Sequence, residues 1–402
     1  MEGEQGWWKE SLQPLPIEIQ EDTDDEYLSK RIVVLANSSE GLYGFRKELL
    51  TAMHKNAEIC ASVPDDGRFP ELEQLGCRIE ETPIDRRGIN PITDLGLLIR
   101  YFRLLHTEKP DLAITYTIKP NIYGGLACRF LRIPYAVNIT GLGTAFQKQG
   151  LLRKLVTFLY RISLKKAKVV FFENSANMEL FQRECIATEN QCVLLNGAGV
   201  NLEHFAYADY PAEETTCFLF IGRVMREKGV EELFQAMERL NAEGQECTLD
   251  ILGGYEENYA DTIRRYEKKG WLRYHGYVKD VRPYIKQAHC VVLPSYHEGM
   301  ANTNLESAAM GRPLITTNIP GCKEAVLDGV SGLLCEPKDA ESLYDAMRQF
   351  ITLPVENRIQ MGREGRTHME VQFDKKKVVV QTITQLRIYA NGRKNLPNSA
   401  GM

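Results

Sequence analysis

Four charged residues in the C-terminal half of the chain are spaced so that they could act on one ligand. Arg223 and Lys228 are cations five residues apart, and Glu298 and Glu306 are carboxylates that enclose seven residues. Arg offers a planar fork and Lys a point charge, and both supply countercharge to a departing diphosphate. The four residues are compatible with a site for a ligand that carries phosphate, and surface salt bridges are the alternative interpretation of the two cations.

The two carboxylates belong to a segment that predicts a strand, a glycine-bearing loop, a helix and a second strand. The apolar runs 291–293 and 314–317 are typical of buried parallel strands. A cap at Asn302 or Thr303 would begin the helix, which should end near Met310. Free N–H groups and the helix dipole favour a phosphate at this helix N-terminus.

The two cations follow another predicted strand. The run 217–221 is apolar, Gly222 and Arg223 come directly after it, and Lys228 precedes a helix expected at 230–240. Strands that alternate with helices predict a doubly wound α/β fold, in which ligands bind at the carboxyl ends of the strands.

The N-terminal half predicts a second α/β unit with two ligand loops. A strand at 31–36 leads to a loop at 37–44 with Gly41 and Gly44, and a helix is expected at 45–55. The loop lacks the G-x-G-x-x-G spacing, which argues against a dinucleotide site and leaves a plain turn as the alternative. Thr140 and Gly141 follow the strand predicted at 135–139.

Composition and charge exclude several other classes of protein. The net charge of −5 argues against a nucleic-acid binder. No apolar run is long enough for a spanning helix, and the acidic N-terminus lacks a signal core. Ten scattered cysteines without a C-x-x-C pair predict reduced thiols in a cytoplasmic protein. The D-x-D sequence at Asp22 and Asp24 is interpreted as part of a solvated acidic tail, so no metal site is predicted.

A basic stretch at 147–172 contrasts with the acidic whole. It has seven basic and no acidic residues, and at helical spacing its apolar and basic positions fall on adjacent faces. A basic amphipathic helix is typical of docking on an anionic membrane, here through 148–168. The alternative is a core-packed helix with a solvated rim. The residues of these two faces are Leu151, Leu155, Phe158, Leu159 and Ile162, and Lys154, Arg161, Lys165 and Lys168.

The segment 291–325, together with Gly222-Arg223 and Glu227-Lys228-Gly229, resembles the retaining GT-B glycosyltransferases of family 4. The similarity extends over about 31–390 and is greatest to enzymes that extend capsular, O-antigen or lipid-linked oligosaccharides. It implies two doubly wound domains that face each other across a cleft. It also implies transfer of a hexosyl or N-acetylhexosaminyl group, with retention, from a nucleotide sugar (by resemblance, UDP-sugar) to a glycan or lipid-linked acceptor. No cofactor or metal is implied.

The resemblance also implies roles for individual residues. Arg223 and Lys228 would neutralise the leaving diphosphate, Glu298 would hold the donor sugar, and Glu306 would accept hydrogen bonds from the ribose. For Glu306 a capping box with Thr303 is the alternative, and for Glu298 a covalent nucleophile. Gly41, Gly44, Thr140 and Gly141 would line the acceptor side of the cleft. The full set of expected donor-binding residues is Gly222, Val278, Gly299, Met300, Ala301, Asn302 and Glu306.

We expect the protein to be cytoplasmic, and to lie on the inner face of the cytoplasmic membrane if the basic helix docks there.

Two rival functions are a nucleotide-sugar 2-epimerase of the same fold and a non-catalytic nucleotide-sugar-binding protein. The expected parts are an acidic extension at 1–30, an acceptor-side domain at 31–205, a nucleotide-sugar domain at 206–374, a helix at 375–390 that returns to the first domain, and a tail at 391–402.

Overall fold

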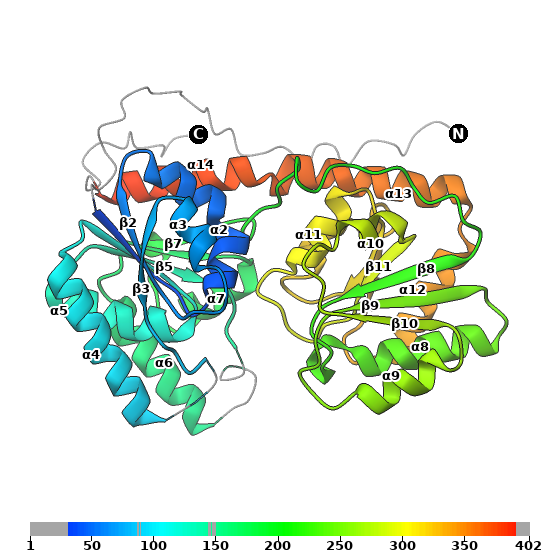
Figure 1. Ribbon diagram of the computed structural model, residues 1–402, viewed down its shortest axis with the longest axis horizontal. Coiled ribbons are helices and arrows are strands. Elements are labelled where there is room, and N and C mark those ends of the chain that lie inside the picture. The colour runs from blue at the N-terminus through cyan, green and yellow to red at the C-terminus, as the bar shows by residue number, and fades with distance from the viewer. Residues whose placement is uncertain (1–30, 87, 89, 144–145, 147–149, 391–402) are drawn as a thin grey trace.

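The computed structural model describes residues 31–86, 88, 90–143, 146 and 150–390. They form two α/β domains side by side (Figure 1). The extension at 1–30 with its D-x-D sequence, the tail at 391–402 and Lys148 lie outside the described residues. Among the helices of the described residues, none is both long and apolar enough to cross a membrane.

The first domain is built on a parallel sheet of seven strands in the order β3-β2-β1-β4-β5-β6-β7. Its central strands are buried along their length because helices cover both faces, with separate apolar clusters on the two sides. The elements are β1 (Arg31–Leu35), α2 (Ser39–His54), β2 (Glu58–Val63), α3 (Phe69–Gln74), β3 (Cys77–Glu81), α4 (Pro91–Glu108), β4 (Leu112–Tyr116), the π-helical turn η2 (Pro120–Gly124), α5 (Gly125–Leu131), β5 (Tyr135–Ile139), α6 (Leu151–Leu164), β6 (Val169–Phe172), α7 (Ser175–Arg183), η4 (Glu189–Gln191) and β7 (Cys192–Leu194).

The second domain repeats the plan with six parallel strands in the order β10-β9-β8-β11-β12-β13. Apolar clusters again fill both faces of its sheet. The elements are β8 (Thr216–Ile221), η5 (Arg226–Lys228), α8 (Val230–Ala242), β9 (Cys247–Leu252), α9 (Ala260–Glu267), β10 (Leu272–Gly276), α10 (Arg282–Gln287), β11 (Cys290–Leu293), α11 (Asn302–Ala309), β12 (Leu314–Thr317), η6 (Lys323–Ala325), β13 (Gly332–Cys335), α12 (Ala340–Thr352) and α13 (Val355–His368).

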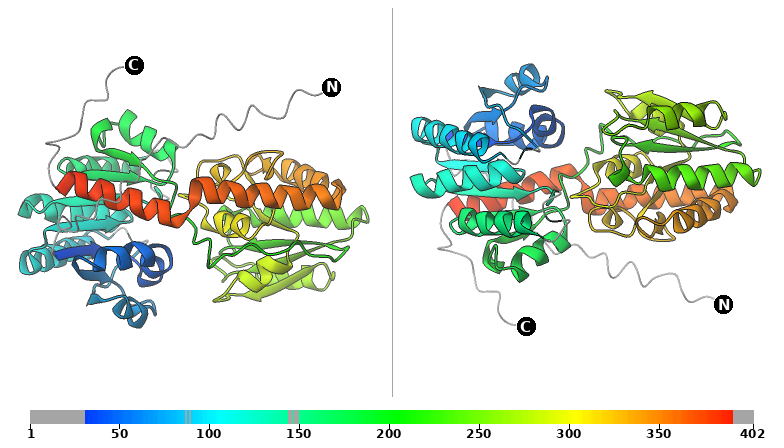
Figure 2. Two further views of the ribbon diagram at one scale, coloured as in Figure 1. Left: turned by 90° about the horizontal axis from the view of Figure 1, so that it is seen from above. Right: turned by 90° about the horizontal axis from the view of Figure 1, so that it is seen from below.

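The chain passes between the domains twice, and the backbones of the two connecting segments are hydrogen-bonded to each other. After α13, the π-helical turn η7 (Met369–Phe373) leads to α14 (Lys375–Ala390), which lies on the first domain against α2 and β6. Val200 of the outgoing crossing donates to Phe373 O at 2.7 Å and accepts from Lys375 N at 3.0 Å. Helices α13 and α14 follow one another along one side of the molecule, over both domains (Figures 1 and 2).

Two helix starts differ from the sequence expectation. Helix α2 begins at Ser39, not at Phe45, because Ser38 caps it and Asp66 accepts hydrogen bonds from Ser38 Oγ at 2.6 Å and Glu40 N at 2.8 Å. Helix α11 has Ala301 as its N-cap, with no side-chain capping bond, so neither Asn302 nor Thr303 caps it.

Two other segments also differ. In the described part of the basic stretch, helix α6 ends at Leu164, so Lys165 and Lys168, which were expected on its basic face, lie beyond the helix. Helix α13 was not predicted at all. It contains Gly362 and Gly365, which lower helix propensity, and Gly362 packs so closely that an added Cβ would lie 2.2 Å from Gly311 O.

Candidate active site

The four charged residues lie around the point where the strand order of the second sheet reverses. Strand β8 is followed by Arg223 and its neighbour β11 by the loop with Glu298, while the crossovers from these strands cover opposite faces. Such a switch point opens a crevice at the carboxyl ends of the strands, which is where open α/β sheets bind ligands.

Lys228 and Glu298 contact each other directly. Lys228 Nζ donates to Glu298 Oε1, which also accepts from Ser295 Oγ at 2.8 Å. Gly229 makes this approach possible: its φ is 73°, and an added Cβ would lie 2.0 Å from Pro294 O. The turn that carries the cation is thereby packed against the end of β11.

Arg223 stands farther out in the crevice. Its guanidinium pairs with Glu256 at 3.3 Å, and its side chain is 53% exposed. The strand ends beneath it are tightly packed, since a Cβ on Gly253 would lie 1.9 Å from Gly222 O. Arg223 can therefore move toward a ligand at little energetic cost, because an exposed ion pair contributes little to stability.

Glu306 projects from the second turn of α11. Burial raises the pKa of its carboxyl to about 7, and Lys375 acts in the opposite direction. The N-cap of the helix is Ala301, so Glu306 is not the third residue of the helix and cannot form a capping box with Thr303. The capping alternative is therefore wrong.

The loop from Gly299 to Asn302 offers fewer amides than expected. Ala301 N donates to Gly321 O at 2.7 Å, and Asn302 N to Met300 O at 3.0 Å. Within the described residues, the amides of Gly299 and Met300 have no such partner. Of the four amides predicted to bind donor oxygens, those of Gly299 and Met300 therefore remain as candidates.

The first domain touches this loop across the cleft. A Cβ on Gly299 would lie 1.9 Å from Thr140 O, and one on Gly141 would lie 3.8 Å from Gly299 Cα. The buried side chain of Met300 packs against Gly197 of the first domain. Thr140 and Gly141 therefore face the donor loop, as expected for residues lining the cleft.

The other predicted cleft residues are placed differently. Gly41 and Gly44 lie within α2, not in a loop, and Gly41 N donates to the capping Ser38 Oγ at 2.9 Å. Val278 follows β10 next to Tyr277, whose hydroxyl donates to Glu40 Oε1 of the first domain at 2.7 Å. The region after β10 thus adjoins the cleft. The prediction for Gly41 and Gly44 depended on a loop at 37–44, and the structure has helix α2 there from Ser39 onward.

Two histidines of the second domain have hydrogen-bond partners in the structure, and a third adjoins the site. His289 accepts from Cys217 N at 3.1 Å, and His275 Nε2 lies 3.0 Å from Asp250 Oδ1. His297 adjoins Glu298, and burial lowers its pKa. Among the described residues, no cluster of His, Cys, Asp and Glu could hold a metal ion.

The sequence reasoning missed two residues that contact the site. Ser295 is completely buried and bonds to Glu298, and Asn174 of the first domain donates to Gly299 O at 2.6 Å. Ser295 stands three residues before Glu298 at a strand end, which is a local signal that could have been used. Asn174 shows only the signal of a helix cap, because its partner is distant in the sequence.

Comparison with known proteins agrees with this architecture. A family model described as "Glycosyl transferases group 1" matches residues 215–352, and one described as "Glycosyl transferase 4-like domain" matches residues 46–197. A glycosyltransferase structure from Rickettsia africae superimposes with a TM-score of 0.75 at 17% identity, over 92% of this chain and 100% of that one.

Two relatives cover most of the chain. An N,N'-diacetylbacillosaminyl-diphospho-undecaprenol alpha-1,3-N-acetylgalactosaminyltransferase of Campylobacter jejuni is 28% identical over 78% of this chain and 88% of its own length. The capsular polysaccharide biosynthesis glycosyltransferase CapM of Staphylococcus aureus is 24% identical over 86% of this chain and 93% of its own.

Two facing doubly wound domains, with the charged site at the switch point of the second, define the GT-B class of glycosyltransferases. The chain belongs to family 4 of that class, as both family models and the relatives agree. The predicted family and fold are confirmed.

Proposed function

We propose that the protein transfers a sugar from a nucleoside diphosphate sugar to an acceptor hydroxyl, with retention at the anomeric carbon. The observation that carries the proposal is the Lys228–Glu298 pair beside Arg223, opposite Thr140 and Gly141 of the other domain. This arrangement supports the proposal, because the cations can supply countercharge to a diphosphate and the carboxylate can accept from sugar hydroxyls in the same cleft.

In the proposed reaction the bond from the anomeric carbon to the diphosphate oxygen breaks while the acceptor oxygen bonds to that carbon on the same face. The acceptor proton passes to the leaving phosphate. Arg223 and Lys228 stabilise the charge that grows on the diphosphate, an interaction that strengthens toward the transition state. Glu298 holds the sugar hydroxyls and so places the anomeric carbon.

The donor and acceptor classes are inferred from the relatives. Anabaena HepE, which has the same fold at 16% identity, has a solved complex with UDP. The Campylobacter relative is named as an N-acetylgalactosaminyltransferase on a diphospho-undecaprenol-linked sugar, and CapM as a capsular polysaccharide enzyme. We propose a UDP-hexose or UDP-N-acetylhexosamine donor and a lipid-linked or polysaccharide acceptor in cell-surface polysaccharide synthesis.

The test is transfer from a panel of UDP- and GDP-sugars to lipid-linked acceptors, with the anomeric configuration of the product read by NMR. Donors are first ranked by thermal shift, because binding to the native state raises the unfolding midpoint. Metal is not required in this proposal, since Arg223 and Lys228 supply the countercharge, so a chelator should leave most activity. Epimerised free donor would favour the 2-epimerase, and binding without turnover a non-catalytic role.

Nucleotide affinity should depend on pH through Glu306. Its raised pKa of about 7 means that the carboxylate, which accepts from ribose hydroxyls, gives way to the neutral acid as pH falls through that value. We expect Glu306→Gln to weaken UDP binding by about 10- to 100-fold near pH 8, where one charged hydrogen bond is lost, but little near about pH 5.5. Isothermal titration at both pH values checks this.

The parent protein serves as the matched control, since protonation of UDP itself affects both proteins equally. An equal loss of affinity at the two pH values would contradict the titration of Glu306. An unchanged affinity with a lowered unfolding temperature would show a structural role only.

We further propose that α6 docks on an anionic membrane surface at the cytoplasmic face. Part of the side expected to be apolar is open: Leu151 is 85% exposed and Phe158 55%, whereas Leu159 of the same side packs against the core of the first domain. The exposed part of this face supports the proposed docking over the alternative of a face packed entirely against the core. Lys154 of α6 is exposed, as are Lys165 and Lys168 directly after the helix. Arg161 is also exposed but donates to Glu184 O at 2.6 Å.

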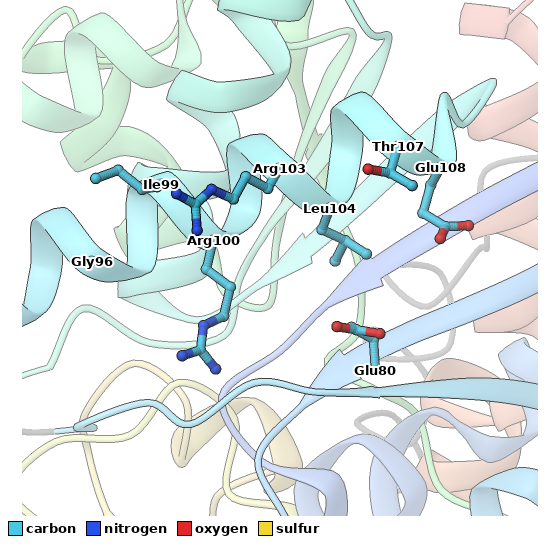
Figure 3. Close-up of a pocket in the computed structure, with 8 residues that line it drawn as sticks. All are labelled: Glu80, Gly96, Ile99, Arg100, Arg103, Leu104, Thr107 and Glu108. Carbon is cyan, nitrogen blue, oxygen red and sulfur yellow. The ribbon is translucent and has the colours of Figure 1, made fainter.

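Helix α4, at the same end of the first domain, also has exposed apolar side chains. Helix α5 contacts both α4 and α6, and the three lie together at one end of the first domain (Figures 1 and 2). Ile92, Leu95 and Ile99 are exposed on α4. A groove along the same helix carries two arginines, as Figure 3 shows; it is lined by Glu80, Gly96, Ile99, Arg100, Arg103, Leu104, Thr107 and Glu108.

Replacing Lys154, Lys165 and Lys168 with Gln should lower binding to anionic vesicles by at least about 10-fold. Each basic residue near such a surface contributes about 1 kcal/mol. Vesicle sedimentation measures the loss, and UDP affinity should be unchanged. Lys268, Lys279 and Lys286 of the second domain are also exposed, so their replacement with Gln is a control of equal charge. Equal loss in both triple variants would rule out docking through α6.

A further inference from the structure

Asn174 of the first domain uses the two ends of its side-chain amide for two different purposes. It follows β6, is 2% exposed, and caps α7 by accepting from Asn177 N at 2.9 Å. Its Nδ2 donates to Gly299 O of the second domain at 2.6 Å. The cap fixes the orientation of the amide, so that its donor end is aimed across the cleft.

The residue before Asn174 is anchored as well. Glu173 is buried and pairs with Arg46 of α2 at 2.5 Å, and the Arg46 guanidinium lies 5.0 Å from the centroid of the Tyr116 ring. Breaking a buried ion pair is costly because it leaves an uncompensated charge. The turn that presents Asn174 is therefore held by α2 and by α7 together.

The receiving loop has little freedom at this point. Gly299 lies against Thr140 O on the first-domain side, where a Cβ would approach to 1.9 Å. On its other side lies Gly321, whose Cβ would come within 2.7 Å of Gly299 O and 2.8 Å of Glu298 O. The backbone of Glu298 and Gly299 is therefore enclosed between the two domains, and the hydrogen bond from Asn174 joins them there.

We propose that Asn174 is a positioning residue through which the first domain sets the Glu298 loop when the cleft is closed. The proposal rests on the proposed sugar transfer, because it gives Glu298 its place against the donor sugar. The contact spans the domains, so it forms only when they approach as they do in this structure. Donor nucleotide alone binds to the second domain and does not require it.

Two substitutions separate the cross-cleft role from the capping role. Asn174→Asp and Asn174→Ser both keep an oxygen that can cap α7, but Asp cannot donate to Gly299 O and Ser is too short to reach it. We expect kcat to fall about 5- to 10-fold for Ser and further for Asp, whose carboxylate would face a carbonyl. UDP affinity and the unfolding temperature should remain at parental values.

A second measurement does not depend on activity. Hydrogen exchange of the peptide that contains 296–302 should become faster in both variants, because the loop loses a hydrogen bond across the cleft. Asn90→Asp is the matched control: Asn90 caps α4 by accepting from Ile92 N at 2.9 Å and lies in the same domain.

The outcomes are distinct. Faster loop exchange with lower kcat and unchanged UDP affinity supports the proposal, provided that Asn90→Asp changes neither. If hydrogen exchange of the loop or kcat is unchanged in both variants, the proposal is overturned. It is also overturned if kcat falls only in variants whose unfolding temperature falls as well. If the parent protein transfers no sugar, the proposed function fails, and the exchange experiment still decides whether Asn174 holds the loop.

Discussion

Glu298→Gln should lower sugar transfer by at least about 100-fold while UDP binds as well as before or better. In the structure this carboxylate is the partner of Lys228 and of Ser295 Oγ. Gln keeps the shape but loses the charge with which the sugar hydroxyls and the cation interact, and charged hydrogen bonds contribute roughly 1.5–3 kcal/mol each. Free UDP has no sugar, and neutralising Glu298 releases Lys228 to bind its diphosphate.

Initial rates beside isothermal titration with UDP measure the two effects. Ser295→Ala is the companion variant, since it removes one neighbour of Glu298 and keeps the charge; its rate should lie between those of the parent and Glu298→Gln. Near-parental rates for Glu298→Gln would remove Glu298 from the proposed mechanism.

Lys228→Ala should reduce turnover by about 10- to 100-fold or more and should also weaken UDP binding. The lost ammonium faces charge that grows on the leaving diphosphate, so its contribution is larger in the transition state than in the ground state. The variant also leaves Glu298 without its cation, which places an unpaired carboxylate beside the incoming phosphates. Both consequences weaken binding of the donor diphosphate.

Arg226→Ala is the matched control for this variant. Arg226 belongs to the same short turn η5, two residues away, but its side chain is 69% exposed, and its ion pair with Glu231 is long, at 3.5 Å. A loss of rate in Arg226→Ala as large as in Lys228→Ala would mean that the turn matters and not the ammonium. Steady-state kinetics at saturating donor separates turnover from affinity.

Most of the strands could be predicted because each has a local pattern in the sequence, and the charged residues that follow two of them could be named for the same reason. The run 291–293 is apolar at every position and the run 314–317 begins with two apolar residues, which is typical of buried parallel strands, and each run is followed by its own turn residues. The C-terminal helix predicted at 375–390 is α14, since no glycine or proline interrupts its pattern. Residues placed directly after strands then had to meet at one edge of the sheet.

Contacts between distant segments were not predictable from such patterns. Lys228 and Glu298 are 70 residues apart, and Asn174 and Gly299 are 125 apart. Neither contact could therefore be predicted from a local spacing pattern. The start of α2 was misplaced for a related reason: Asp66, from a later loop, satisfies the hydroxyls and amide at its first turn. The sequence showed two glycines there and suggested a loop.

For α6 the periodicity identified an apolar side but not what covers it. A hydrophobic pattern at helical spacing is the same whether the side meets a core or a lipid. In the structure, the side chains of Leu155 and Phe158 are exposed to solvent. It also shows that Arg161 is held by Glu184, a contact that charge counting would have missed.

The return of α14 to the first domain has a consequence for how this protein can be divided or recombined. Leu386 of α14 is buried in the same apolar cluster as Leu42 and Leu49 of α2. The first domain is therefore discontinuous in sequence: its core is completed by the last described helix of the chain. A fragment that ends near residue 205 would expose that cluster to water and is expected to aggregate. A hybrid with a relative's acceptor domain should exchange 375–390 together with the N-terminal half.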